Sequence, residues 1–277
     1  MKKFFISLLA MSILFMLTIA NVKSIRIGTE GAYPPWNNLN AAGELEGAEI
    51  DFGNEACKRM GAECEWVIQD WDGIIPALLN GKYDIIIAGM SITEERKQKV
   101  NFTNGYMNDG ARFWVLKDSG LANISVGGIT KVNMNNAGGK EKAAVGQMIA
   151  AFEDKNVCVQ SSTTHANFAT QYMSTGSNVK LYQTVDDHNI DLMAGRCDAV
   201  LSDVASAVDF MATDQGSNAA FTGPTFSGGP WGDGVGGAIR KEDTDILEMW
   251  NKAIAEMSAD GTTANITEKW FGRDMSM

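Results

Sequence analysis

The chain alternates short apolar runs with segments of helical periodicity. Ile25 to Thr29 and Tyr83 to Ala88 are mainly apolar runs with the length of a buried strand. Phe52, Ala56 and Met60 recur every four residues, as they would on one face of a helix. Strand patterns separated by helical patterns predict βαβ units and mainly parallel sheets, which is an α/β fold.

The second half of the chain repeats this alternation. Strand patterns are each followed by a helical pattern at Val157–Gln160 and Thr164–Met173, at Val179–Gln183 and Asp186–Ala194, and at Cys197–Leu201 and Val204–Ala212. A long amphipathic helix around Trp250 and a short helix through Trp270 end the chain. Two such blocks, before and after residue 110, predict two α/β lobes. The Gly- and Asn-rich stretch 119–140 is expected to be an inserted surface loop of the second lobe.

The N-terminus has the pattern of a secretion signal. Lys2 and Lys3 precede an apolar run from Phe4 to Ala20 that ends in small residues. This predicts a signal peptide, residues 1–20, that is cleaved after Ala20. The alternative is an uncleaved membrane anchor, although the run is slightly short of the roughly 20 residues that a span needs.

The charge and the cysteines restrict the partners. A formal net charge of -11 disfavours nucleic acid and anionic lipid, and weakly favours cationic solutes. Cys57 and Cys64 flank a predicted helix end, and an oxidising compartment would let them form a disulfide. Cys158 and Cys197 could be paired or could be buried free thiols. The sequence contains no C-x-x-C motif and no His cluster, so neither a metal nor a cofactor is expected.

Ligands of α/β lobes bind where the carboxyl ends of strands meet helix starts. That rule selects four segments of this chain, 29–33, 88–96, 160–164 and 201–203. An α-amino acid would need a guanidinium and backbone N–H groups for its carboxylate, and a carboxylate for its ammonium. The four segments contain residues of these types.

Arg96 and Asp203 are the candidate ligands of the two charged groups. Arg96 lies in the first turn of a helix capped by Thr93, where the helix dipole favours acids, so a cation there suggests an anionic ligand. Ser91 can donate to the same anion, and segment 160–164 offers N–H groups and hydroxyls from the other side. The alternatives are a solvated helix charge for Arg96 and an N-cap for Asp203.

The other half of the predicted site is Glu30, Tyr33, Trp36 and Trp71. Tyr33 and Trp71 could sandwich a flat or aliphatic side chain, or a guanidinium by a cation–π contact. Glu30 could pair with the far end of that side chain, or could be a solvated loop acid. His165 and His188 are expected to be structural, although His165 could contact the ligand from a helix start.

Several long motifs resemble one known family. They are IGTEGAYPPWN, LEGAEIDFGNEACKRMG, WDGIIPALLNGKYDIIIAGMSITEERK, AGRCDAVLSD and WGDGVGGAIRKEDT. Together they resemble the extracytoplasmic solute-binding proteins of polar amino acid ABC transporters, in particular the lysine/arginine/ornithine-, histidine- and octopine/nopaline-binding proteins. The similarity extends from about Ile25 to Phe271.

The resemblance implies a two-lobed periplasmic-binding-protein fold of type II, with two parallel-dominated sheets joined by two hinge strands. The implied division is lobe 1 at 21–108 and 240–277, hinges at 109–113 and 235–239, and lobe 2 at 114–234. It also implies a periplasmic monomer that delivers its solute to an ABC transporter permease.

Roles for individual residues follow from the same resemblance. Arg96 would hold the ligand carboxylate with help from Ser91 and Thr163, and Asp203 would hold the ammonium with the Gly89 carbonyl. Cys57 and Cys64 match a disulfide found in some members. The full set of expected ligand-binding residues is Glu30, Tyr33, Trp71, Ala88, Gly89, Met90, Ser91, Arg96, Gln160, Ser162, Thr163, Thr164 and Asp203.

Two departures from the family bear on the ligand. Ala88-Gly89 replaces a Ser-Ser pair of the basic-amino-acid binders and resembles the glutamine-binding branch, whereas the 119–140 stretch resembles the octopine branch. Asp203 would repel the second carboxylate of an opine, so a free amino acid is favoured, arginine first, with ornithine, lysine, histidine and glutamine open. The alternatives are an opine-binding protein, a dehydratase on the same fold with Glu30 as general acid, and a sensor component.

Overall fold

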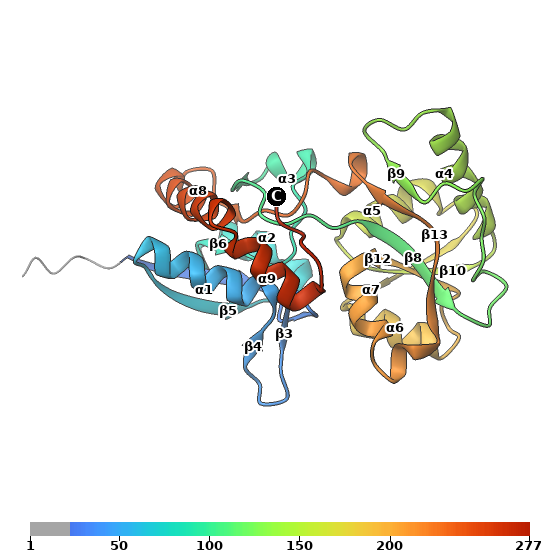
Figure 1. The fold of residues 1–277 in the computed structure, drawn as a ribbon, viewed down its shortest axis with the longest axis horizontal. Coiled ribbons are helices and arrows are strands. Elements are labelled where there is room, and N and C mark those ends of the chain that lie inside the picture. Colours follow the sequence, from blue (N-terminus) through green and yellow to red (C-terminus); the bar gives the residue numbers. More distant parts are fainter. Residues whose placement is uncertain (1–22) are drawn as a thin grey trace, which may run out of the picture.

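The computed structural model describes residues 23–277, so the predicted signal peptide lies outside the described residues. The chain forms two lobes that lie side by side, and each is a sheet with helices packed against it (Figure 1). Both chain ends of the described part lie in the same lobe, which the sequence colours show as blue and red together.

The first lobe is built on a five-stranded sheet of order β5-β1-β6-β14-β7. Its strands are β1 Ser24–Thr29, β5 Glu63–Ile68, β6 Ile85–Ile86, β7 Asn101–Phe102 and β14 Ala238–Ile239. Its helices are α1 Ala48–Met60, α2 Ile74–Leu79, α3 Glu94–Lys97, α8 Thr244–Ala259 and α9 Thr262–Phe271, with a 3-10 turn at Trp71–Gly73. A small sheet of β2 Ala32–Tyr33, β3 Asn37–Leu39 and β4 Leu45–Glu46 projects from it.

The apolar faces of β1, α1 and α8 meet in one core. Ile25 and Ile27 of β1 are fully buried, and so is Phe52 on α1. Trp250 of α8 is buried in the same cluster, where α8 and α9 pack against α1. The predicted periodicities of β1, α1 and α8 are therefore present, and this packing holds the carboxyl ends of β1 and β6 at the side that faces the other lobe.

The second lobe is built on a six-stranded sheet of order β11-β10-β12-β8-β13-β9. Its strands are β8 Ala111–Leu116, β9 Lys131–Asn133, β10 Asn156–Gln160, β11 Asn178–Tyr182, β12 Ala199–Asp203 and β13 Ala219–Ser227. Its helices are α4 Gly139–Ala151, α5 Thr164–Tyr172, α6 Val185–Met193 and α7 Val204–Met211, with 3-10 turns at Gln215–Asn218 and Gly229–Trp231.

Two segments connect the lobes. The chain leaves the first sheet after Phe102 and enters the second at Ala111, and it returns between Ser227 and Ala238. The ranges expected to be hinges, 109–113 and 235–239, overlap these crossings. Rotation of the lobes about them stays a prediction.

The sheets are less parallel than the pattern suggested. β1, β5 and β6 are parallel, and so are β10, β11 and β12, but the strands beyond them are antiparallel: β14 to β6 and β7, and β8 to β12 and β13. The reason is that chain crossings between lobes enter the sheets without the helix that a parallel connection needs.

The stretch 119–140 was expected to be a surface loop, and this was wrong in part. It contains β9, which pairs in parallel with β13, and its Val132 is buried in the core of the second lobe. Helix α4, which begins at Gly139, had no predicted counterpart. Both disulfides are formed: Cys57–Cys64 as predicted, and Cys158–Cys197, for which the free-thiol alternative is wrong.

Candidate functional site

A cavity lies between the two lobes, at the strand ends that the sequence selected. It encloses about 320 Å³ when its opening is included. Its lining residues are Glu30, Tyr33, Trp71, Ala88, Gly89, Ser91, Arg96, Gln160, Thr163, Thr164, His165 and Asp203. All but two of the predicted ligand-binding residues are in this set, the exceptions being Met90 and Ser162. That any of the predicted residues contacts a ligand stays a prediction.

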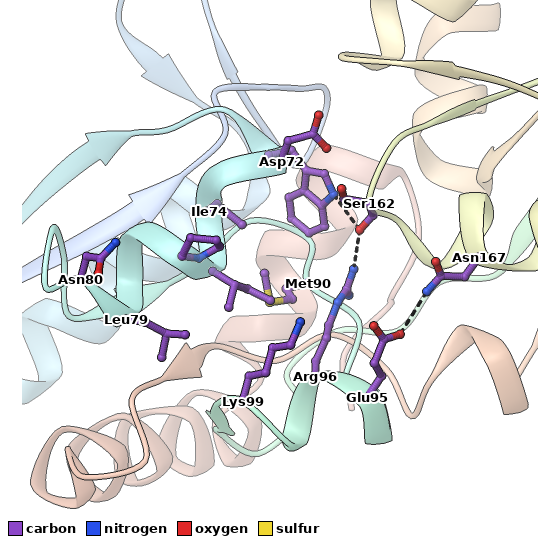
Figure 2. A pocket seen from close by; sticks show the side chains of 13 residues that line it. Asp72, Ile74, Leu79, Asn80, Met90, Glu95, Arg96, Lys99, Ser162 and Asn167 are labelled. Carbon is purple, nitrogen blue, oxygen red and sulfur yellow. Dashed lines mark hydrogen bonds between the residues drawn. The ribbon is translucent and has the colours of Figure 1, made fainter.

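Met90 and Ser162 line a larger groove that adjoins the cavity (Figure 2). The groove measures about 1370 Å³ including its open side, and Trp71 and Arg96 stand between it and the cavity. The polar side chains along the groove, such as Lys99 and Glu95, are exposed, whereas Glu30 and Thr164 in the cavity are buried. Buried polar groups discriminate between ligands better than solvated ones, so the cavity is the candidate site.

Arg96 reaches across from the first lobe. Thr93 caps α3 and accepts a hydrogen bond from the Arg96 amide at 3.2 Å, which orients the side chain toward the cleft. The guanidinium donates to the carbonyl oxygens of Ser91 at 3.0 Å and of Ser162 at 3.3 Å, and lies 5.3 Å from the Trp71 ring centre. Within residues 23–277 no carboxylate is in ion-pair distance of it. Burial lowers the pKa of Arg96 to about 10, so it remains a cation at neutral pH.

The segment after β10 faces Arg96 from the second lobe. Thr163 is the N-cap of α5: its hydroxyl accepts from the Ala166 amide at 3.0 Å and donates to the Gln160 carbonyl at 2.7 Å. The sequence analysis expected this hydroxyl to help hold an anion, but in this structure its proton is used within the loop. Ser162 has a positive φ of 57°, which turns its carbonyl toward Arg96 and the Trp71 indole.

Asp203 ends β12 on the second lobe. Its carboxylate accepts a hydrogen bond from the Tyr33 hydroxyl at 2.5 Å, a contact between the lobes. His165 Nε2 lies 3.3 Å from the other oxygen, at an angle that falls short of a hydrogen bond, and the imidazole is buried. His165 was expected to be structural, and its ring does pack against that of Trp231 in a tilted arrangement, but it also lines the cavity. The carboxylate is therefore placed where an ammonium could bind.

Glu30 follows β1 and lines the same cavity from the first lobe. It is buried and accepts a hydrogen bond from Gln160 Nε2 at 2.6 Å. Burial raises the pKa of Glu30 to about 7, the Gln160 bond opposes the rise, and the charges of Asp70, Asp72 and Asp186 add to it. A buried acid surrounded by other acids favours a cationic partner.

Two loops of the cavity are held by Glu49, which the sequence analysis did not select. Both of its carboxylate oxygens accept from the Gly89 amide, at 2.7 and 2.8 Å. It also accepts from the Tyr106 hydroxyl at 2.5 Å and from Asn37, whose amide oxygen accepts from the Gly31 amide. The only sequence signal was an acid on the buried face of the helix AEIDFGNEACKRM.

Gly89 itself is required by its surroundings. Its φ of 61° lies in the left-handed region, and a Cβ there would come within 3.3 Å of the Tyr33 ring. Trp36, which the sequence placed in the site, is instead fully buried in the first core beside Phe271, and among the described residues it does not line the cavity. The apolar environment of its ring explains this.

Hydrogen bonds join the lobes around the cavity in addition to those already described. Ser161 donates to Asp72 at 2.7 Å, Asn167 to Glu95 at 3.2 Å and Gln183 to Asp70 at 3.3 Å. The first and second of these lie along the outer edge of the cleft, where both partners are at least partly exposed. The lobes are therefore in direct contact through these three bonds as well as through Tyr33 and Asp203.

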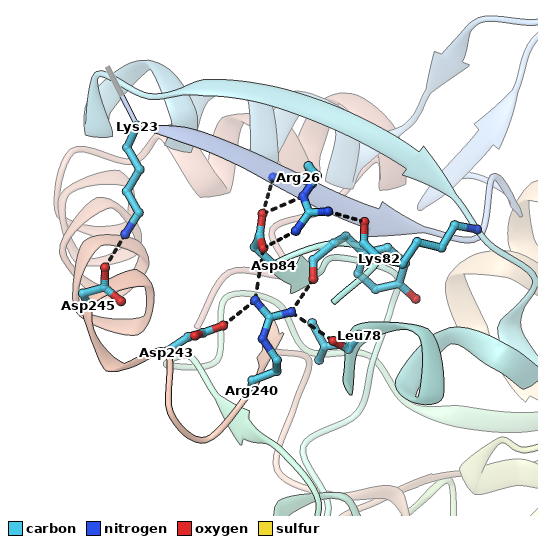
Figure 3. A network of polar contacts seen from close by, with 9 residues as sticks. Lys23, Arg26, Leu78, Lys82, Asp84, Arg240, Asp243 and Asp245 are labelled. Atoms are coloured by element: carbon cyan, nitrogen blue, oxygen red, sulfur yellow. Dashed lines mark hydrogen bonds and ion pairs between the residues drawn. The ribbon is translucent and has the colours of Figure 1, made fainter. Parts of the chain in front are cut away.

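A second charged cluster lies inside the first lobe, away from the cleft (Figure 3). Asp84 accepts from Arg26 at 2.8 and 3.1 Å and from Arg240 at 3.1 Å, and Arg240 also pairs with Asp243. Burial raises the pKa of Asp84, but the arginine bonds outweigh it and hold that pKa below its usual range. The cluster ties β1 and β6 to the segment after β14.

Two structural features are absent from the described part of the chain, a metal-type side-chain cluster and a membrane-spanning helix. From residue 23 onward, no cluster of three or more His, Cys, Asp or Glu side chains could hold a metal ion. In the same range, none of the helices has both the length and the apolar character that a membrane span requires.

Comparisons with known proteins agree with this geometry. Residues 25–273 match the model for bacterial extracellular solute-binding proteins, family 3. An L-arginine-binding protein of Pseudomonas aeruginosa is 36% identical, over 96% of this chain and 95% of that protein. An octopine-binding periplasmic protein of Rhizobium meliloti is 34% identical, over 93% of each. The solved structure of an ancestral arginine-binding protein bound to arginine has a TM-score of 0.75 and 34% identity, and the match covers 90% of this chain and 98% of that one.

Proposed function

The chain belongs to family 3 of the bacterial extracellular solute-binding proteins, and on that basis we propose that its cavity binds one free polar or basic amino acid, arginine in preference. The relatives are periplasmic binding proteins named for what they bind and not for a reaction, so a role in solute transport replaces the dehydratase alternative.

One observation supports this proposal most directly. A cation from the first lobe, Arg96, and an anion from the second, Asp203, border the same cavity, and no opposite charge from the described residues neutralises Arg96. In the proposed complex Arg96 binds the ligand carboxylate and Asp203 binds its ammonium. The ligand then connects the lobes, so it favours the closed form by its difference in affinity for the two forms.

The preference for arginine rests on the residues that we propose contact the side chain of the ligand. Glu30 would pair with a distal guanidinium, and Tyr33 and Trp71 would contact the side chain. The elevated pKa of Glu30 is what a carboxyl shows when it is buried before its cationic partner arrives. An opine has a second carboxylate, which Asp203 would repel, so the similarity to an octopine-binding protein does not change this preference.

The cellular setting is proposed from the same premise. The chain would be exported by its predicted signal peptide, residues 1–20, act in the periplasm as a monomer and deliver its ligand to an ABC transporter permease. The domain division at 109–113 and 235–239 would supply the hinges for opening and closing.

A panel of ligands tests the proposal. Thermal unfolding is measured with L-arginine, L-ornithine, L-lysine, L-histidine, L-glutamine and octopine in turn. A ligand present at ~100 times its dissociation constant should add about 2.7 kcal/mol of stability, and L-arginine is expected to give the largest shift. A shift with octopine alone would contradict the assignment to a free amino acid, and no shift with any of the six would contradict amino-acid binding.

A further inference from the structure

Asp203 occupies the position of an N-cap without performing its function. It directly precedes α7, and an Asp at that position ordinarily accepts a hydrogen bond from the second or third amide of its helix. Among residues 23–277 the Asp203 side chain makes no such bond. Its carboxylate turns instead toward Tyr33 and His165, into the cavity.

The cap of α7 comes from another part of the chain. The Ala205 amide, the second of the helix, donates to Asp109 Oδ2 at 2.7 Å. The Val204 amide, the first, donates to the Gly110 carbonyl at 2.8 Å. Residues 109 and 110 lie in the first crossing between the lobes, so this crossing satisfies the Ala205 amide, which Asp203 would otherwise be placed to bind.

Asp109 is itself firmly held. Its side chain is only 3% exposed, and its Oδ1 accepts from Arg273 at 2.7 Å and from the Gly110 amide at 2.8 Å. Asp109 and Asp203 border the same small cavity beside the crossing. Burial and then the charge of Asp203 raise the pKa of Asp109, in keeping with two carboxylates that lie close together.

From this geometry we propose that Asp109 is a positioning residue for ligand binding: by capping α7 in place of Asp203, it leaves the Asp203 carboxylate free to bind the ligand ammonium. The inference rests on the proposed function, because it assigns the ammonium to Asp203. Without Asp109, the Asp203 side chain would rotate to cap its own helix, and the ammonium would lose its partner. Asp109 and Asp203 form no hydrogen bond to each other, so Asp109 acts on Asp203 only by binding the Ala205 amide.

The test compares two ligands that differ in one group. L-Arginine carries the α-ammonium and 5-guanidinopentanoate lacks it. The affinity for L-arginine divided by the affinity for 5-guanidinopentanoate therefore measures how much the protein's contacts with the α-ammonium contribute to binding. Calorimetric titration gives this ratio for the wild type, Asp109→Ala, Asp109→Asn and Arg273→Met. Arg273→Met is the matched control, because it removes the ion pair to Asp109 and leaves the cap in place.

The proposal predicts that Asp109→Ala lowers the ratio by at least about tenfold, while Arg273→Met keeps it within about threefold of the wild type. Asp109→Asn should fall between them, since one amide oxygen cannot accept from both Ala205 and the Gly110–Arg273 pair. In an Asp203→Asn background, Asp109→Ala should change the ratio no further.

Other outcomes overturn the proposal. If Asp109→Ala and Asp109→Asn weaken both ligands equally and keep the wild-type ratio, Asp109 is structural only. If Arg273→Met lowers the ratio as much as Asp109→Ala, the ion pair and not the cap is responsible. If the wild-type protein binds L-arginine and 5-guanidinopentanoate with equal affinity, Asp203 does not bind the α-ammonium. Failure of the wild type to bind any amino acid of the panel would instead remove the proposed function itself.

Discussion

The first lobe contributes to two charged clusters that differ in how their charges are satisfied. In the cluster around Asp84, each arginine meets a carboxylate, and Arg240 has further carbonyl acceptors from Leu78 and Tyr83. In the cleft, Arg96 meets only carbonyl oxygens within the described residues, and Glu30 meets a neutral amide. The pKa of Asp84 is accordingly lowered, whereas that of Glu30 is raised to about 7.

This contrast separates stability from binding. A carboxylate that already has its cations stabilises the fold, because its charged form is favoured in the native state. A buried charge without an opposite partner destabilises the empty form and becomes favourable when a ligand supplies the partner. Substitutions in the two clusters should therefore affect different measurements.

The largest effect is expected at Arg96. Arg96→Ala should weaken L-arginine binding by at least about 3 kcal/mol, roughly a hundredfold or more, because the ligand carboxylate would be buried without a cation. The melting temperature of the ligand-free protein should change little, since a partly buried charge without an opposite partner is removed. Calorimetric titration and ligand-free melting measure the two quantities.

Arg26→Ala is the matched control for that substitution, because it removes an arginine of the same lobe from the Asp84 cluster. It should leave the affinity unchanged. Near-normal affinity in Arg96→Ala would mean that the anion is bound elsewhere.

The next effect concerns Asp84. Asp84→Ala should lower the stability by about 2 kcal/mol and the melting temperature by about 5 °C, since two arginines lose their shared carboxylate. Ligand affinity should stay within about twofold of the wild type, because the cluster lies away from the cleft. A large loss of affinity without a loss of stability would show that the two clusters are coupled.

Glu30 should make binding depend on pH. A guanidinium beside it favours the ionised form, so binding releases a proton wherever free Glu30 is still protonated. The affinity for L-arginine should therefore rise by up to about tenfold per pH unit below pH 7 and level off above it. The stability of the ligand-free protein has the opposite trend: a raised pKa means that stability falls as the pH rises through 7.

Titrations at several pH values, in buffers of different ionisation enthalpy, measure this proton release. Glu30→Gln is the control, and its affinity should depend much less on pH in that range. An equal pH dependence in wild type and Glu30→Gln would assign the proton to another group.

The smallest effect is expected at the edge of the cleft. Ser161→Ala removes the hydrogen bond that Ser161 donates to Asp72, which joins the two lobes directly and does not involve the ligand. Because Asp72 is exposed, the closed form should lose less than about 1 kcal/mol, which is at most a fivefold loss of affinity. A loss as large as that of Arg96→Ala would mean that direct contacts between the lobes, and not the ligand, determine closure.

Local patterns were sufficient for much of the fold. The strand and helix at 156–172 and the helix of Trp250 are close to their predicted positions, because their apolar spacing matches their burial. Helix α4 was missed because GKEKAAVGQMIAA contains two glycines and has a weak apolar face. β9 was missed because its three residues gain their partner only when β13 lies beside them.

The candidate site followed from a topological rule, and its supporting residues did not. Asp203 ends β12 and Arg96 lies in the helix that follows β6, which are places where the rule for α/β lobes directs attention. Glu49 and Asp109 act through amides 40 and 96 residues away, and no local pattern marks such pairs. His165 differs again, because a helix-start histidine has several common roles and only its distance to Asp203 distinguishes them.

A crystal structure with L-arginine tests the central claim most directly. The claim is that one amino acid binds both charged side chains of the cleft, with its carboxylate paired to Arg96 and its ammonium paired to Asp203. The predicted result is a closed protein in which the ligand carboxylate lies within hydrogen-bond distance of the Arg96 guanidinium and its ammonium within that distance of the Asp203 carboxylate. An arginine bound in the outer groove beside Lys99, or bound between the lobes with neither contact, would contradict it.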